Sequence, residues 1–325
     1  MMPVELREML YLDVERVRAL AGQLWPNGIP EGLELRSGTQ KGGKAAVMIA
    51  EGSYGRVSED VERRALAESL FPLLEIELEQ EDFIVDASGW SEDPQHWSDD
   101  ELPRWAQPGD LLRITAPGTL LDARHVGEMA GSFGAALSGA ARMGLLDEVR
   151  PNGSTQGPKM ENAKNFDPSS PWREDHIAPM PEFEGFKPRE LRGIAQLARG
   201  LFPEGVHLRL TPVAAGAQAI WCRLQEGRAY LDSEPEVLFS RYGLNPQPWT
   251  VVGVVGTTAR RHAEPFTPPD IVQGDKVVRG LAMDAFNGFI ESMTDLGFAS
   301  GPQYPGFSIV PIAVYREIRR ARDPQ

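Results

Sequence analysis

The stretch "WTVVGVVGTTARR" occupies residues 249–261 and begins with the apolar run Trp249–Val255. Its apolar run predicts a strand at the centre of a sheet. Three basic residues, Arg260, Arg261 and His262, follow this run and would lie where the strand ends. Such a cluster can bind an anion such as a nucleotide, although charged residues are also ordinary on a solvated surface.

The segments on either side of this strand predict further strands and helices. Strand patterns occur at residues 82–90, 109–118, 206–212, 218–224, 228–232 and 307–318, and Pro311 places the last one at an edge or a bulge. Helix patterns occur at residues 14–24, 58–80, 187–202, 233–243 and 275–297. Asp13 is placed to cap the first helix, and Pro72 to break or kink the second. We therefore expect an α+β fold with helices packed on a mixed sheet.

The middle of the chain has a different composition. Residues 150–187 are rich in Pro, Gly, Asn and Ser and show little periodicity, which is typical of a long loop or linker. We expect one α+β half over residues 1–149, this loop, and a second α+β half over residues 188–325.

Two aromatic-rich segments lead to expectations about burial. The helix at residues 275–297 is amphipathic, and we expect its apolar face to be buried; this face comprises Val277, Val278, Leu281, Phe286, Phe289, Ile290 and Met293. Trp90, Trp97 and Trp105 alternate with acidic residues in a loop. We expect these tryptophans to anchor an acidic surface loop, the alternative being stacking against a sugar or a cationic peptide.

Charge and composition limit the classes of partner. The chain has 47 acidic and 33 basic residues and a formal net charge of −14. Because nucleic-acid binding depends on Lys and Arg neutralising phosphates, we expect no nucleic-acid partner. The N-terminal residues lack the apolar core of a signal peptide, and no apolar run reaches the roughly 18–20 residues of a membrane span. We expect a cytoplasmic protein without a membrane partner.

Cysteine and histidine usage predicts neither a metal nor a cofactor. Cys222 is the single cysteine and lies in a strand pattern without a basic cluster nearby, so we expect a buried structural thiol. The five histidines stand far apart in the sequence and form no close-spaced metal pair.

One stretch has the opening of a phosphate-binding loop. In "SGTQKGGKAA" (residues 37–46), Gly38 is followed after four residues by Gly43 and Lys44. A working loop needs Ser or Thr next, for Mg²⁺, and then a long helix. Here Ala45 follows, and glycines interrupt the chain within two turns, so we interpret the stretch as a flexible loop.

Segments spread over most of the chain resemble a bacterial family, domain-of-unknown-function family 6414. They are "YLDVERVRALAGQL", "QPGDLLRITAPGTLLDARHV", "LFSRYG…WTVVGVVGTT" and "SIVPIAVYR", in this order. The resemblance implies a soluble bacterial protein with no assigned catalytic residues. An association with phage defence or stress is our hypothesis by analogy.

We consider two main functions. The first is a non-enzymatic ligand-sensing or protein-interaction module, which fits the absence of a catalytic motif in the sequence. Its contacts to a protein or a small anionic ligand would be Arg16, Arg18 and Gln23 on the first helix, or Arg260, Arg261 and His262. The alternative is a hydrolase of a nucleotide or sugar with paired carboxylates, for which Asp110 and Asp122 are the first candidates. A third possibility is a membrane-acting effector that releases the Gly/Ala-rich helix at residues 127–146.

Overall fold

The computed structural model describes residues 6–28, 56–98, 100–129, 143, 193, 196, 205–214, 216–243, 245–259, 267, 270, 272–273, 276–295 and 301–318 with the elements that they form. Residues 1–121 and 205–325 form one compact unit, and residues 122–204 form a second. The account below concerns the first unit.

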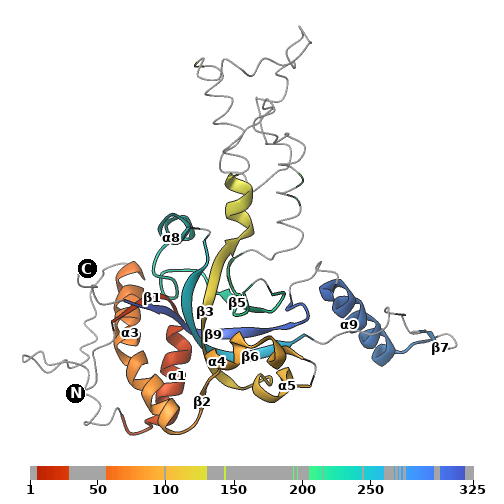
Figure 1. Cartoon of the computed structure of the whole chain (residues 1–325), viewed down its shortest axis with the longest axis horizontal. Coiled ribbons are helices and arrows are strands. Elements are labelled where there is room, and N and C mark those ends of the chain that lie inside the picture. Colours follow the sequence, from red (N-terminus) through yellow and green to blue (C-terminus); the bar gives the residue numbers. More distant parts are fainter. Residues whose placement is uncertain are drawn as a thin grey trace, which may run out of the picture. The chain divides into compact units, whose positions relative to one another are not determined.

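Seven of the strands join in one mixed sheet (Figure 1). They are β1 (Arg7–Leu12), β2 (Ile84–Asp86), β3 (Leu111–Asp122), β4 (Val206–Leu210), β5 (Ala219–Leu224), β6 (Gln247–Thr258) and β9 (Gly306–Glu317). The short strands β7 (Val272–Gln273) and β8 (Lys276–Val277) pair only with each other. The stretch at residues 249–261 therefore forms most of the strand β6, as its apolar run predicts.

Five strands of this sheet close into a barrel. β6 pairs antiparallel with β3 on one side and with β9 on the other. β9 pairs in parallel with β5, and β5 pairs antiparallel with β4. β4 lies next to β3 in the sheet. Just after the end of β4, the N–H of Thr211 donates to the carbonyl of Pro117 in β3 at 2.7 Å. The strands therefore close in the order β3–β6–β9–β5–β4–β3. β3 precedes residues 123–205 in the sequence, and the other four strands follow them.

The strand β9 changes partner halfway along. Residues 306–309 pair with β5, whereas residues 313–317 pair with β1. The register with β6 shifts where Gly253 faces Pro311, which is a bulge. The bulge expected at Pro311 is confirmed, but β9 has neighbours on both sides and is not an edge strand.

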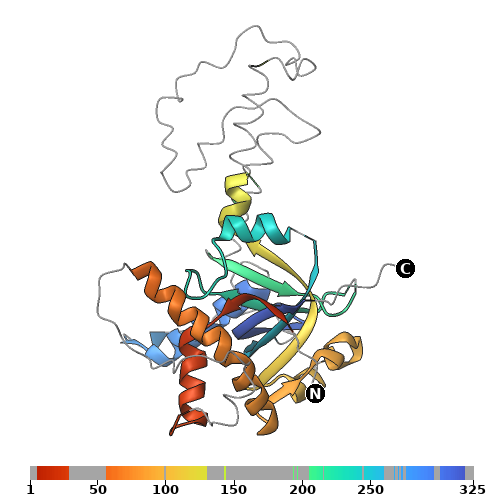
Figure 2. The same ribbon diagram turned by 90° about the vertical axis from the view of Figure 1, so that its left-hand side faces the viewer.

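Two helices pack beside each other on one side of the sheet (Figures 1 and 2). α1 (Val14–Leu24) begins where the Asp13 side chain accepts a hydrogen bond from the N–H of Arg16 at 3.1 Å, so the predicted N-cap is confirmed. α3 (Arg56–Gln80) continues through Pro72 without a break. The core between these helices and the sheet includes Val17, Phe71 and Leu74.

The segment between β2 and β3 covers one part of the barrel core. It contains α4 (Ser88–Glu92), a 3₁₀ helix η1 (Pro94–Trp97) and α5 (Leu102–Trp105). Trp97 and Trp105 are buried and pack on Phe307 at ring-centroid distances of 5.7 and 5.4 Å. Trp90 is 47% exposed. The predicted anchoring of an acidic loop by its tryptophans is therefore confirmed for two of the three.

The remaining helices differ in how much of their apolar surface is buried. α8 (Pro235–Tyr242) ends at Gly243 and contributes Leu238, Phe239 and Tyr242 to the barrel core. α9 (Arg279–Asp295) exposes the face that we expected to be buried, because Phe286, Phe289 and Ile290 are each more than half exposed. Its periodicity predicts the helix correctly but does not specify what packs against it.

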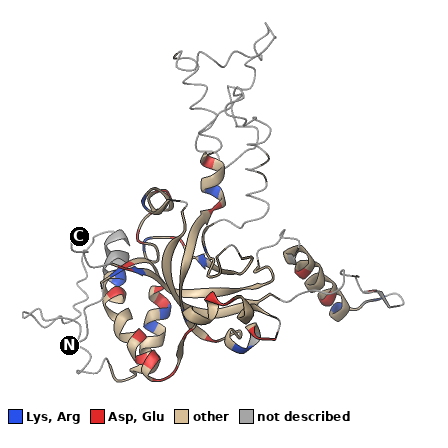
Figure 3. Ribbon diagram, in the orientation of Figure 1, with Lys and Arg blue, Asp and Glu red and all other residues tan. Residues whose placement is uncertain are grey.

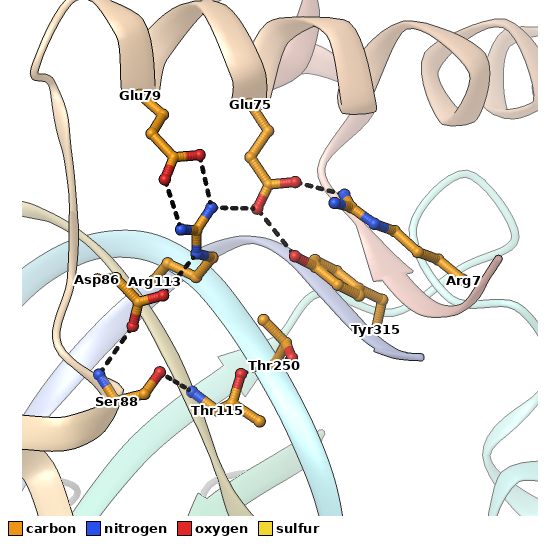
Figure 4. Close-up of polar contacts among 9 residues, drawn as sticks. All are labelled: Arg7, Glu75, Glu79, Asp86, Ser88, Arg113, Thr115, Thr250 and Tyr315. Carbon is orange, nitrogen blue, oxygen red and sulfur yellow. Dashed lines mark hydrogen bonds and ion pairs between the residues drawn. The ribbon is translucent and has the colours of Figure 1, made fainter. Parts of the chain in front are cut away.

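A network of charged and polar side chains holds α3 on the sheet (Figure 4). Glu75 of α3 is buried, pairs with Arg7 of β1 and accepts a hydrogen bond from the hydroxyl of Tyr315 of β9. Arg113 of β3 donates to both carboxylate oxygens of Glu79, at 3.0 and 2.8 Å, and to Asp86 at 3.0 Å. These bonds link one helix to four strands, so we assign them a structural role.

Candidate functional site

The hairpin of β4 and β5 turns one row of side chains into the barrel and the other outward, as the pleat of a strand requires. The inward side chains are all buried, and all are aliphatic except the thiol of Cys222. They are Val206, Leu208, Leu210, Ile220, Cys222 and Leu224. The outward positions carry His207, Arg209, Trp221 and Arg223. We call these four residues the β4–β5 face.

The register of the hairpin brings the four residues together. His207 lies opposite Arg223, and Arg209 lies opposite Trp221. The guanidinium carbon of Arg209 is 5.6 Å from the centroid of the Trp221 ring, which is a cation–π contact. The Nε of Arg209 is buried and has no hydrogen-bond partner in the described part of the chain. A donor left in this state destabilises the protein unless an acceptor reaches it.

The histidine of this face is held in place by the backbone. Its Nδ1 lies 2.9 Å from the carbonyl oxygen of Gly205, and because a carbonyl only accepts, Nδ1 carries the proton in this bond. His207 is buried, whereas Arg209 and Trp221 are half-buried and Arg223 is exposed. Arg209, Trp221 and Arg223 are therefore the side chains of this face that reach the solvent at least in part.

Small residues continue this surface beside Trp221. Ser308 of β9 pairs with Trp221 and accepts a hydrogen bond from the N–H of Thr257 at 3.1 Å. Gly256 of β6 is exposed, and a Cβ there would lie 2.9 Å from the Ser308 hydroxyl. The residues of β9 and β6 next to the indole therefore have short side chains.

The two longest connections of the barrel begin and end at opposite ends of this face. The connection of residues 123–205 enters β4 at Val206, which pairs with Leu224 at the end of β5. The connection of residues 259–305 enters β9 at Gly306, which pairs with Ala219 at the start of β5.

The charge of the β4–β5 face differs from that of the whole chain. Its four residues include two guanidinium groups and no carboxylate. A carboxylate lies beside the face, since a Cβ on Gly205 would be 3.5 Å from Oε1 of Glu226 and 3.8 Å from Nε of Arg223. The four side chains of the face therefore carry two guanidinium charges, with the Glu226 carboxylate beside them.

The contacts that we predicted on the first helix lie elsewhere. Arg16, Arg18 and Gln23 are on α1, where charged residues of both signs alternate (Figure 3). Arg16 is ion-paired with Asp13, the N-cap of its own helix, at 3.0 Å. Arg260, Arg261 and His262 follow β6 directly but lie outside the described residues, as do Gly38–Lys44 and most of residues 127–146.

The carboxylates that we selected for hydrolysis are not a pair. Asp110 precedes β3 and its carboxylate accepts from the N–H of Gln107, whereas Asp122 ends β3 and pairs with Arg124. They lie at opposite ends of a twelve-residue strand, whereas catalytic carboxylates lie about 5–10 Å apart. Among the described residues, the carboxyl groups with a shifted pKa have it lowered, which does not suit a general acid.

The cysteine behind the face is inert, as we expected. Cys222 is fully buried in the barrel core. Burial raises the pKa of its thiol to about 12, so it stays protonated at neutral pH.

None of the four residues of the β4–β5 face is among the contacts predicted from the sequence, although the sequence carries a signal for them. In "VHLRL" and "AIWCRL" every second residue is polar or aromatic, and the two arginines and the tryptophan fall on the outward positions. The alternation alone predicts that one side of each strand faces the solvent. It does not predict that the two strands pair in the register that joins Arg209 to Trp221.

The strand order defines the class of fold. Counted along the chain, the barrel strands β3, β4, β5, β6 and β9 are arranged in the order 1-2-3-5-4, with the third and fifth parallel and the helix α8 between the third and fourth. This is the order of the OB-fold, a five-stranded Greek-key barrel that binds ligands on its second and third strands. The β4–β5 face occupies these strands.

The family model described as "Domain of unknown function (DUF6414)" matches residues 6–315, and the chain belongs to this family. The resemblance seen in the sequence is thereby confirmed. Comparisons with curated proteins and with solved structures found no match.

Two further kinds of feature concern the described residues. No helix in this part of the chain is long and apolar enough to cross a membrane. No three His, Cys, Asp or Glu side chains within the described ranges are grouped to hold a metal ion.

Proposed function

We propose that this protein is a non-enzymatic ligand-binding module that uses the β4–β5 face as its binding surface. The observation that carries the proposal is the cation–π pair of Arg209 and Trp221 on the second and third strands of a barrel with OB-fold order. A rigid sheet holds these side chains, and rigid elements position binding groups better than loops do.

Binding rather than catalysis is favoured by the chemistry of the face. Arginine stays protonated and cannot act as a base, and tryptophan is a donor only. The buried His207 already uses Nδ1 for Gly205. The face therefore offers charge, hydrogen-bond donors and a stacking surface, without a paired nucleophile and base. A cytoplasmic sensor in a defence or stress system is the role that we propose for such a module.

The experiment is a thermal-shift screen of the purified chain against nucleotides, sugar phosphates, sugars and acidic peptides. A ligand that binds the folded state raises the melting temperature by mass action. We expect a shift with at least one anionic ligand, its loss in the double variant Arg209→Gln/Arg223→Gln, and its retention in Arg104→Gln. Arg104 is an exposed arginine on α5 and makes a matched control for the loss of charge.

Two results would contradict the proposal. One is a shift of equal size in the wild type and the double variant, which would place the binding surface elsewhere. The other is conversion of the bound ligand to a product during the incubation, detected by chromatography, which would make the protein an enzyme.

A further inference from the structure

We infer that the apolar face of α9 is a dimer interface, on which a second copy of this chain packs its own α9 in the antiparallel direction. This surface is separate from the β4–β5 face, and the inference does not depend on the proposed function. It rests on the exposure of the helix, on the positions of its apolar side chains and on the charge at its N-terminal end.

The first step concerns the exposure of α9. None of the side chains that the structure describes on this helix, residues 279–294, is buried. Among them Met283, Phe286, Phe289 and Ile290 are 62%, 64%, 53% and 56% exposed. A short isolated helix is only marginally stable in water, and helices in proteins are stabilised mainly by the packing of an apolar face. Within the described part of the chain, α9 lacks this packing.

The second step concerns the distribution of side chains around the helix. A helix turns by about 100° per residue, which places the four exposed apolar side chains within about a third of its circumference. The acidic residues Asp284 and Glu291 stand two positions away from phenylalanines of this face, about 200° around the helix. Both carboxylates therefore point to the opposite side and do not repel a second copy at the apolar face.

The third step concerns symmetry. A two-fold dimer interface must be complementary to itself, so that each contact occurs twice with the two copies exchanged. The midpoint of α9 is Asn287. An antiparallel copy centred on this residue sets Phe286 beside Phe289 of the other copy. The same arrangement sets Met283 beside Ile290. Each exposed apolar side chain of the face then has an apolar partner.

The fourth step concerns the charge at the start of the helix. Arg279 is exposed at the first position of α9, seven residues before Phe286 and hence on the same side. A positive charge opposes the helix dipole at the N-terminus and favours it at the C-terminus, but the last turn of α9 contains no basic residue. An antiparallel copy places its Arg279 beside this last turn. A parallel copy would instead set the two arginines beside each other.

The test is sedimentation velocity of the full chain over a series of concentrations. One pair of helices is smaller than a standard interface, so we expect a monomer–dimer equilibrium with a dissociation constant of about 1–100 μM. Phe286→Glu/Phe289→Glu should abolish the dimer. Leu66→Glu/Phe83→Glu adds the same charges at side chains of similar exposure, 55% and 58%, and should leave the dimer intact. Circular dichroism of each variant checks that it is folded.

A second pair of variants tests the contribution of charge. Arg279→Gln should weaken the dimer by about threefold or more, because the partner helix loses the positive charge beside its last turn. Arg104→Gln removes the same charge from α5 and should leave the dissociation constant unchanged.

Engineered cysteines test the direction of the helices. In the antiparallel pair, position 283 of one copy lies beside position 290 of the other, whereas two copies of either position are offset by about 9–12 Å along the axis. A disulfide needs Cα atoms closer than about 7 Å. A mixture of Met283→Cys and Ile290→Cys should therefore form a disulfide-linked dimer on oxidation, and neither variant alone should do so. The native Cys222 is buried and does not compete.

Three results would overturn the inference. A monomer at every concentration would mean that the same chain or a different protein covers the face. A dimer that persists in Phe286→Glu/Phe289→Glu would use another surface. Cross-linking of Met283→Cys with itself, but not with Ile290→Cys, would mean that the two helices are parallel.

Discussion

The hydroxyl of Tyr315 donates a 2.8 Å hydrogen bond to Glu75, a residue 240 positions away in the sequence. Both side chains are buried, and the carboxylate also pairs with Arg7 and with Arg113, the latter at 3.6 Å. Burial raises the pKa of Tyr315, so its hydroxyl keeps the proton that it donates. One carboxylate thus joins α3 to β1, β3 and β9.

Removing this carboxylate should destabilise the protein strongly. We expect Glu75→Gln to lower the free energy of unfolding by about 3 kcal/mol, because it leaves two arginines without their buried counter-charge. Urea unfolding followed by circular dichroism measures the change. Glu81→Gln, an exposed position just beyond α3, should change it by less than about 0.5 kcal/mol. A loss below about 1 kcal/mol at Glu75 would show that the network contributes little.

Stability should fall in acid because of the carboxylates around Arg113. The hydrogen bonds from Arg113 lower the pKa of Glu79, and although burial alone would raise the pKa of Asp86, hydrogen bonds from Ser88 and Arg113 outweigh it. A lowered pKa in the folded state adds stability above the unfolded pKa, near 4, and this is lost as pH falls through the folded pKa.

The urea midpoint measured from pH 7 to pH 2.5 tests this dependence. The wild type should lose stability below about pH 4.5, and Glu79→Gln/Asp86→Asn should lose less over the same range. Because both carboxylates are about half exposed, we expect each to contribute no more than about 1 kcal/mol. Identical slopes for the two proteins would contradict the assignment.

Two glycine substitutions should act in opposite directions. A Cβ on Gly253 would lie 2.6 Å from the carbonyl of Val310 and 2.8 Å from the Cα of Pro311, so Gly253→Ala should destabilise by about 2–3 kcal/mol. Gly22 in α1 has nothing within 4 Å of its Cβ position, so Gly22→Ala should stabilise by about 0.5–1 kcal/mol. Thermal unfolding of both variants measures the difference, and a stabilising Gly253→Ala would contradict the close packing at the bulge.

The single thiol should be unreactive until the protein unfolds. Cys222 is fully buried, and burial raises its pKa to about 12, so little thiolate is present at pH 8. Titration with Ellman's reagent should detect no thiol in the native protein and one per chain in 6 M guanidinium chloride. Rapid labelling of the native protein at pH 8 would show that the barrel opens readily.

The tryptophans between β2 and β3 should differ in their effect on stability. Trp97→Ala removes a buried ring that stacks on Phe307, and we expect a loss of about 3–5 kcal/mol. Trp90→Ala removes a ring that is half exposed, and we expect a loss below about 1 kcal/mol. Equal losses for the two would mean that the loop is held by something other than its buried rings.

The local elements could be read from the sequence because local signals specify them. Asp13 and Gly243 mark helix ends through capping and a positive φ, and the apolar run of β6 marks a buried strand. The closed barrel could not be read in the same way. It depends on pairs such as Val251 with Val314, which lie far apart in the sequence and carry no complementary pattern.

The residues of the candidate site were even harder to predict from the sequence than the barrel. Arg209 and Trp221 become partners only when β4 and β5 pair in one register, and a shift of one strand by one residue would turn its outward side chains inward and separate the two. The charged residues that stand out in the sequence, such as Arg16 and Arg18, are close only along the chain, since residues two apart on a helix do not face each other. The guanidinium group of Arg16 is ion-paired with Asp13, the residue that caps α1, so this arginine has a role within its own helix.

The partner change of β9 also sets the order of assembly during synthesis. β1 is the first of these strands to be made, but its ladder partner is residues 313–317, so that ladder cannot form until those residues have been synthesised. The barrel likewise cannot close until residues 306–309 of β9 pair with β5. Pairing over such separations is slow. During that interval the apolar strands β3 to β6 are exposed to wrong partners, which makes the unfinished barrel prone to aggregation.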